Sequence, residues 1–370
     1  MEWKEYELGK LLPYEQPTAY IVESTDYSDA YNIPVLTAGK SFILGYTNET
    51  TGIFTQLPVI IFDDFTTATQ YVNFKFKVKS SAMKILHINT DLVLPKYIYY
   101  RMQIIQFDHS THKRYWIQQY SKIKIAVPSL PEQECIVARI EELFSELDKS
   151  VETLRTTKQQ MAVYRQAVLK EAFGKVTTHT PFGKIIDARL GKMLDKEKNT
   201  GNYRKYLRNI NVRWFSFDLS DLLEMRIEDG EIEKYSVSLN DLIICEGGEP
   251  GRCAVWDKQD SLFYQKALHR VRFLDNSNPK FYMYYLCFFA QSGQLCRYFT
   301  GTGIKHLTGQ SLSKVIVPTA DRTIQDSIVA EIESRLSVCD SIKKTVDTAL
   351  QQAEALRQSI LKKAFEGGLA

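Results

Sequence analysis

The segment from residue 189 to residue 213 carries side chains that are suited to binding a polyanion. It holds eight basic residues against two acidic ones, interleaved with tyrosines and followed by Trp214. Basic groups contact phosphates, and planar polar side chains can hydrogen-bond to base edges. The candidates for phosphate or guanine are Arg204, Lys205 and Arg208, and those for adenine are Asn209 and Asn211. An ordinary solvated charged surface is the alternative interpretation.

Two glycine-containing segments could let the backbone approach a ligand closely. In GGEPGR (247–252), Arg252 could reach a base edge or a phosphate, although a tight turn between strands explains the glycines equally well. In TGTGIKH (300–306), Lys305 and His306 offer hydrogen-bond donors. This second segment lacks the spacing and the Gly-Lys-Ser/Thr ending of a phosphate-binding loop.

The first third of the chain offers fewer candidates. In HSTHKRYW (109–116), Lys113 and Arg114 are candidate phosphate contacts, and Trp116 is expected to be packed. Thr37, Lys40 and Lys79 lie at predicted strand ends and complete the candidates for DNA contact. His109 and His112 have a spacing that could suggest a metal pair, but no further ligands cluster near them in the sequence, so no metal site is expected.

The sequence lacks the patterns of enzymes that act on DNA. An F-x-G-x-G loop for S-adenosylmethionine and a catalytic N/D-P-P-Y/F or P-C motif are absent, as are Walker and G-x-S-x-G motifs. A nuclease needs clustered carboxylates, and the adjacent Asp63 and Asp64 are not followed by an E-x-K sequence. We predict a non-catalytic chain that binds no cofactor or metal itself.

Composition bounds the class of protein. At 370 residues the chain is expected to form two or more cores, and its net charge of +3 is weak evidence for any partner. The six cysteines form no C-x-x-C pair, which is typical of a reduced, cytoplasmic protein. The charged N-terminus lacks the apolar core of a signal peptide, and the most apolar run (281–290) is too short for a membrane span.

An internal repeat shows which elements must position these residues. Residues 133–173 align without a gap to residues 325–365, and 18 of the 41 positions are identical. Both copies have apolar residues at helical spacing and neither contains an internal Gly or Pro, so each predicts one helix about 60 Å long. We expect the two helices to pack antiparallel about an approximate two-fold axis; a coiled-coil spacer or dimerisation stalk is the alternative.

A weaker repeat covers the segments between the helices. LPKYIYYRMQ (94–103) and NPKFYMYYLCFFAQ (278–291) both predict aromatic-rich helices, and SKIKIAVP (121–128) and SLSKVIVP (311–318) both predict a strand before the long helix. Strand patterns fill the rest, including VLTAGKSFIL (35–44), NFKFKV (73–78) and DLIICEG (241–247). The predicted fold is therefore α+β, with two α/β-type domains at 1–128 and 176–318 and two long helices within 129–175 and 319–370.

Several of these segments resemble one known family. VPSLPEQECIVARI (127–140) is similar to the start of the first spacer helix in specificity subunits of type I restriction–modification systems, and AEALRQSILKKAFEGGL (353–369) is similar to their C-terminal signature. Residues 206–225, 239–256 and 300–318 resemble parts of a target-recognition domain, and residues 31–54 and 60–86 resemble a shorter one. Before the second long helix the family's usual P-L-P is replaced by VPTADRTIQ (317–325).

The resemblance implies a division of labour. Each target-recognition domain would read one half of a bipartite site in double-stranded DNA, while the helices set the unread gap and dock two methyltransferase subunits, with restriction–translocase subunits as optional partners. S-adenosylmethionine, ATP and magnesium would be bound by those partners. Two alternatives stay open: a specificity subunit of a type IIB-like or solitary methyltransferase system, and a coiled-coil adaptor that does not bind DNA.

Overall fold

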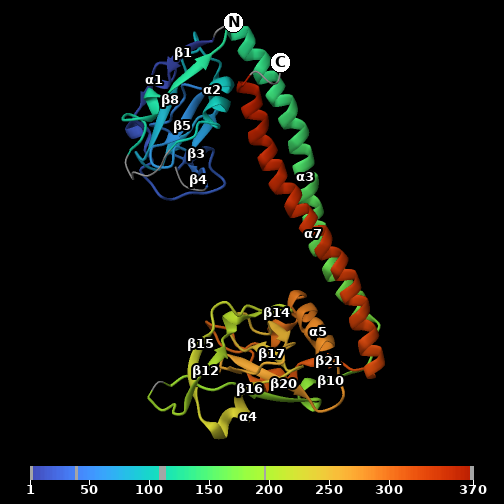
Figure 1. Cartoon of the computed structure of the whole chain (residues 1–370). Coiled ribbons are helices and arrows are strands. Elements are labelled where there is room, and N and C mark those ends of the chain that lie inside the picture. The colour runs from blue at the N-terminus through green and yellow to red at the C-terminus, as the bar shows by residue number, and fades with distance from the viewer. Residues whose placement is uncertain (1–2, 38–40, 108–113, 196, 367–370) are drawn as a thin grey trace. The chain divides into compact units, whose positions relative to one another are not determined.

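The computed structural model describes residues 3–37, 41–107, 114–195 and 197–366. The chain forms two compact units, one made of residues 1–154 with 348–370 and the other of residues 155–347. Each unit contains one globular domain and part of each of two long helices, α3 (Leu130–Gly174) and α7 (Arg322–Phe365) (Figure 1). The expected α+β fold with two long helices is confirmed. In its described part the chain has no helix long and apolar enough to cross a membrane.

The first domain stacks two sheets and a helix. A four-stranded antiparallel sheet has the order β2-β8-β5-β6, a three-stranded sheet has the order β4-β3-β7, and β1 pairs with β9. Strand β5 is buried on both faces: Ile60 and Phe62 pack with the helix α2, while Val59 and Ile61 face the three-stranded sheet. The bounds are β1 Lys4–Glu7, α1 Leu8–Leu11, β2 Tyr14–Glu15, β3 Ile33–Leu36, β4 Ile43–Thr47, β5 Val59–Asp63, β6 Thr69–Val72, β7 Lys77–Val78, β8 Met83–His87, α2 Pro95–Met102 and β9 Lys124–Val127.

The second domain has a larger version of the same arrangement. Its two four-stranded sheets have the orders β11-β20-β17-β18 and β15-β12-β19-β16, and β10 pairs with β21. Helix α5 packs against the first of these sheets (Figure 1). The bounds are β10 His179–Pro181, β11 Ile186–Leu190, β12 Asn202–Leu207, β13 Val212–Arg213, β14 Ser216–Phe217, β15 Leu223–Ile227, α4 Ile232–Tyr235, β16 Ser236–Val237, β17 Leu242–Cys245, β18 Cys253–Val255, β19 Leu262–Tyr264, β20 Leu268–Phe273, α5 Pro279–Gln291, α6 Gly309–Lys314 and β21 Ile316–Pro318.

The two domains repeat one topology. The sheet β2-β8-β5-β6 corresponds strand for strand to β11-β20-β17-β18, and the parallel pair β3–β7 corresponds to β12–β19. A close approach is repeated as well: a Cβ at Gly9 would lie 3.2 Å from the Cβ of Ser121, and one at Gly183 would lie 2.6 Å from that of Ser313. Both glycines therefore allow the first turn of the domain to pack against the segment before its last strand.

Within each unit the two long helices run antiparallel. In the unit of residues 155–347, ion pairs join Lys158 to Asp347 at 2.7 Å and Arg165 to Asp340 at 2.6 Å. A later residue of α3 thus pairs with an earlier residue of α7, as it does in an antiparallel pair. In the other unit, Asp148 of α3 pairs with Arg357 of α7. The antiparallel packing expected from the apolar stripes is confirmed inside both units.

Two predicted strands differ from the structure. The pattern VLTAGKSFIL (35–44) covers the end of β3 and the start of β4 rather than one strand. In NFKFKV (73–78) only residues 77–78 form a strand. NFKFKV alternates apolar and polar residues and VLTAGKSFIL has apolar residues at both ends, and neither pattern shows where a strand begins or ends.

Candidate nucleic-acid interface

Three segments of the second domain meet at one end of its central strands. The backbone N–H of Leu307 donates to the carbonyl oxygen of Glu246 at 2.7 Å, which joins the segment 300–306 to the loop 246–252. A Cβ at Gly248, whose φ is +78°, would lie 2.7 Å from Nδ2 of Asn209, and one at Gly247 would lie 3.1 Å from Nδ1 of His306. The glycines thus leave room for these side chains. We call residues 208–209, 246–252 and 300–306 the loop cluster.

Arg252 holds the loop cluster together. Its Nη1 pairs with Oε2 of Glu249 at 2.7 Å, and its Nη2 donates to the carbonyl oxygen of Asn209 at 2.9 Å. Only 15% of the side chain is exposed. Cys245 lies beneath the loop, and burial raises the pKa of its thiol to about 11. Arg252 was expected to reach a base or a phosphate, but in this conformation it ties the glycine-rich loop to residue 209.

Asn211 is a structural residue, which corrects the expectation that it pairs with adenine. Its side chain is buried, its Oδ1 accepts from the backbone N–H of Arg208 at 2.9 Å, and its Nδ2 donates to the carbonyl oxygens of Asp218 and Asp221. The amide is fully engaged and cannot reach a base. Arg208 itself pairs with Asp221 at 2.7 Å and is 18% exposed.

Other side chains of the loop cluster are more accessible. Asn209 is partly exposed, and its side-chain amide makes no hydrogen bond within the described part of the chain. Lys305 is exposed and donates from Nζ to the carbonyl oxygen of Gly301 at 2.8 Å. Glu249, which the sequence did not single out, accepts from Nε1 of Trp214 at 2.8 Å. An amide, an ammonium group and a carboxylate thus lie on one surface.

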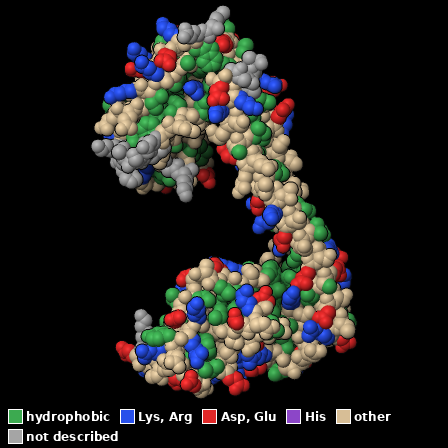
Figure 2. All heavy atoms as spheres, viewed as in Figure 1, with side chains coloured by type: hydrophobic (Ala, Val, Ile, Leu, Met, Phe, Trp, Pro, Cys, Tyr) green, Lys and Arg blue, Asp and Glu red, His purple; other side chains and the backbone are tan. Residues whose placement is uncertain are grey.

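The basic segment 189–213 is divided among different surfaces. Arg204 lies on β12 with Nη2 3.7 Å from Asp229 and its guanidinium over the ring of Phe263. Lys205 is exposed on the same strand opposite Glu224. Figure 2 shows basic and acidic side chains interspersed over the visible face of this domain rather than gathered in one patch. Proximity in sequence therefore overstated the local positive charge.

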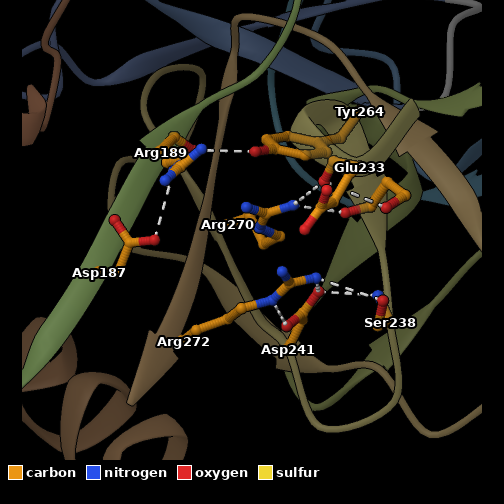
Figure 3. A network of polar contacts seen from close by, with 9 residues as sticks. Asp187, Arg189, Glu233, Ser238, Asp241, Tyr264, Arg270 and Arg272 are labelled. Atoms are coloured by element: carbon orange, nitrogen blue, oxygen red, sulfur yellow. Dashed lines mark hydrogen bonds and ion pairs between the residues drawn. The ribbon is translucent and has the colours of Figure 1, made fainter. Parts of the chain in front are cut away.

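The first arginine of that segment belongs to a polar network between the two sheets. Arg189 lies beside Asp187 at 3.3 Å, and the hydroxyl of Tyr264 donates to its carbonyl oxygen (Figure 3). The buried Arg270 donates from Nη1 to the carbonyl oxygen of Ser236 at 2.7 Å, and Arg272 pairs with Asp241 at 2.6 Å. These contacts join β11 to β19, and β20 to residues 236–241.

The first domain places its candidates at equivalent positions. The backbone N–H of Tyr115 donates to the carbonyl oxygen of Asp64 at 3.0 Å, as that of Leu307 donates to Glu246, so the exposed Arg114 corresponds to His306. Thr37 follows β3 as Arg208 follows β12.

The end of the adjacent strand β7 lies beside Thr37. The backbone N–H of Lys79 donates to the carbonyl oxygen of Leu36 at 2.8 Å, which brings Thr37 and Lys79 together at the ends of two parallel strands. Lys40 and Lys113, and with them His109 and His112, lie outside the described residues.

A buried charge supports this end of the first domain. Nζ of Lys84 lies 3.2 Å from Oδ2 of Asp64, and both side chains are at most 2% exposed. The other oxygen of Asp64 accepts from the backbone N–H of Trp116 at 2.8 Å. In the second domain His269 occupies the place of Lys84 in the strand register, and its Nε2 lies 2.9 Å from the carbonyl oxygen of Leu307. Burial lowers the pKa of His269.

Within the residues that the structure describes, no group of three or more His, Cys, Asp or Glu side chains could hold a metal ion. The polar groups of the loop cluster are those of a surface that makes hydrogen bonds and ion pairs. Amides and carboxylates can read base edges, and lysines can contact phosphates.

Comparisons with known proteins show what the chain as a whole is similar to. Residues 1–157 match the model of the type I restriction modification DNA specificity domain. The chain is 41% identical over 228 residues to the EcoR124I/EcoR124II specificity subunit of Escherichia coli, an alignment that covers 58% of this chain and 54% of that protein. It is 26% identical over 271 residues to the EcoKI specificity subunit of Escherichia coli K12, covering 68% and 58%. The matches thus span little more than half the length of these relatives.

Two solved structures share the fold over nearly the whole chain. A chain from a structure of a type I R-M system, described for its assembly and conformational transition, superposes with a TM-score of 0.74 at 15% identity and covers 99% of this chain and 98% of its own. The HsdS subunit from Thermoanaerobacter tengcongensis superposes with a TM-score of 0.54 at 15% identity, covering 99% and 97%. At this identity the likeness concerns the fold.

Proposed function

We propose that the chain is the DNA-recognition subunit of a type I restriction–modification complex, because residues 1–157 match the model of the type I DNA specificity domain and the chain is 41% identical over 228 residues to a type I specificity subunit. Each domain would read one half of a bipartite site in double-stranded DNA. The chain would carry no catalytic centre, and the two long helices would set the length of the unread gap.

The repeated topology is the observation that carries this proposal. Each domain brings a hairpin loop of its central sheet, the end of a parallel strand pair and a closing segment to one end of the sheet. The equivalent positions hold different side chains: Thr37 and Arg114 in the first domain, Arg208 and His306 in the second. One scaffold with two different sets of polar groups suits the reading of two different half-sites.

The partners in this proposal are two methyltransferase subunits and, optionally, restriction–translocase subunits. Large apolar side chains stay exposed on the long helices, with Val163 68%, Val338 59% and Leu356 51% exposed, and such side chains suit a protein partner. S-adenosylmethionine, ATP and magnesium would be bound by these partners, and the complex would act on DNA in the cytoplasm.

Salt dependence of DNA binding tests the proposal against a coiled-coil adaptor. We would assemble the chain with its methyltransferase and measure the Kd for duplex DNA between 50 and 200 mM salt. A DNA-recognition subunit should raise affinity for one sequence above that of the methyltransferase alone, and the Kd should increase steeply with salt as phosphate contacts are lost. Equal binding with and without the chain would contradict the proposal.

A further inference from the structure

Each domain is fastened to the start of a long helix by a buried glutamine. In the first unit Gln133, on the first turn of α3, is fully buried. Its Oε1 accepts from the backbone N–H of Leu94 at 2.7 Å, and its Nε2 donates to the carbonyl oxygens of Leu92 and Pro128, both at 3.0 Å. Leu94 is the residue that precedes helix α2. One amide therefore joins the long helix, the segment before it and the helix of the domain.

The second unit has the same joint. Gln325, on the first turn of α7, is 2% exposed. Its Oε1 accepts from the backbone N–H of Asn278, the residue that precedes helix α5, at 2.6 Å. Its Nε2 donates to the carbonyl oxygen of Ala320 at 2.8 Å and lies 3.4 Å from Oγ of Ser277. Gln133 and Gln325 are the first identical pair in the aligned repeat. In both, Oε1 accepts from the residue that precedes the helix of the domain, and Nε2 donates to a carbonyl oxygen of the segment before the long helix.

Further contacts of the joint are also duplicated. Lys96 of α2 pairs with Glu141 of α3, and Lys280 of α5 pairs with Glu333 of α7. The end of the other long helix completes each joint through an edge-to-face ring pair. The rings of Tyr97 and Phe365 lie 5.2 Å apart in the first unit, and those of Phe173 and Phe281 lie 5.3 Å apart in the second.

The glutamines differ from the other contacts in being buried. The Lys–Glu pairs are about half exposed, and such pairs contribute little to stability. A buried amide that loses its partner leaves backbone donors and acceptors unsatisfied, so the surrounding segments must shift. A saturated buried amide has one low-energy geometry, and it therefore fixes the angle between the domain and the helix pair within its own unit.

We propose that Gln133 and Gln325 are positioning residues that fix the orientation of each recognition domain on the helix pair. This inference rests on the proposed function. The two glutamines would allow the complex to distinguish a DNA gap of the right length from a gap that differs by a single base pair. Neither residue belongs to the loop cluster or its first-domain counterpart, so the choice of bases within a half-site is independent of both.

The test compares three duplexes that share both half-sites but differ in the gap, which has the natural length or is one base pair shorter or longer. With the assembled complex, kcat/KM for methyl transfer is measured on each duplex, and the ratio of natural to altered gap is the readout. This ratio does not depend on the fraction of active protein. A variant that is merely less stable loses rate on all three duplexes equally.

We expect Gln133→Ala and Gln325→Ala each to lower this ratio by roughly threefold or more, as the loss of one buried hydrogen-bonded group allows. Base preference within the half-sites should stay that of the wild type. Gln159→Ala, an exposed glutamine on the same helix α3, serves as the matched control and should leave the ratio unchanged.

Unchanged ratios in both buried-glutamine variants would overturn the inference. If these variants do not fold, Gln133→Met and Gln325→Met, which keep the length of the side chain and remove only its hydrogen bonds, decide the matter: a fall of the ratio supports the joint, and an unchanged ratio contradicts it. A wild-type complex without sequence preference would instead refute the proposed function, so the two failures are distinguishable.

Discussion

At the scale of single residues, the polar side chains of the loop cluster and of the neighbouring Asn211 have two kinds of task. Arg252 and Asn211 bind other parts of the protein and shape the surface, whereas Asn209 and Lys305 remain available to a ligand. Residue type alone could not separate these tasks, because an arginine after a glycine-rich loop suits either one. What decides is tertiary structure: the acceptors of Arg252 come from residues 209 and 249, which meet only in the folded domain.

Asn209→Ala should relax base recognition in one half-site only. The backbone contact between Asn209 and Arg252 survives the change, and an amide that pairs with a base contributes about 1 to 3 kcal/mol of discrimination. We expect about a tenfold loss of discrimination at one position of the half-site read by the second domain, measured by competition with substituted duplexes. Asn202→Ala, an exposed asparagine on β12, is the control. Equal relaxation of both half-sites would show that the domains do not read separately.

Lys84→Met should destabilise the first domain. The substitution leaves the buried carboxylate of Asp64 without its ion pair, and the loss of one partner of a buried pair costs about 3 to 5 kcal/mol. The free energy of unfolding from denaturant titration measures this cost, with Lys75→Met at an exposed position as the control. A change below about 1 kcal/mol would mean that the carboxylate is accommodated without the lysine.

At the scale of elements, the sequence repeat predicted more than the strand patterns did. A gap-free alignment with helical spacing and no internal Gly or Pro defined both long helices to within a few residues. Strand patterns failed at residues 35–44, where one apparent strand covers the end of β3 and the start of β4. The repeat also contained the signal for the buried glutamines, since Gln133 and Gln325 are identical at its start. A polar residue in the first turn of a helix is ordinarily exposed, so its burial could not be foreseen.

An insertion in the helices should change the gap in the DNA and not the bases. Asp148 pairs with Arg357 and Lys158 pairs with Asp347, so a turn added to one helix alone would shift one set of partners out of register. We therefore add about one turn to α3 within 145–160 and one to α7 within 345–360. One turn is about 5.4 Å and one base pair about 3.4 Å, so the gap should lengthen by one or two base pairs.

Methylation mapping of the paired-insertion variant reads out this prediction. The same two half-sites around a longer gap would support the role of the helices in setting the gap. New bases in either half-site would contradict it, because the loops of the two domains are unchanged.

At the scale of the whole molecule, the chain joins one domain topology twice to one type of helix. Domain duplication could be predicted from short similarities such as LPK and NPK before each aromatic helix. The equivalence of Thr37 with Arg208, and of Arg114 with His306, could not, because it appears only in strand register and backbone hydrogen bonds. The repetition of a scaffold with different surface residues is the property that links the fold to the proposed reading of two half-sites.

The most direct test of that central claim is a genome-wide methylation map of cells that carry the partner methyltransferase, with and without this gene. We predict a methylated motif of two short blocks around a fixed gap, which disappears when the gene is deleted and returns when it is restored. An unchanged map, in cells where the methyltransferase is shown to be expressed, would contradict the account.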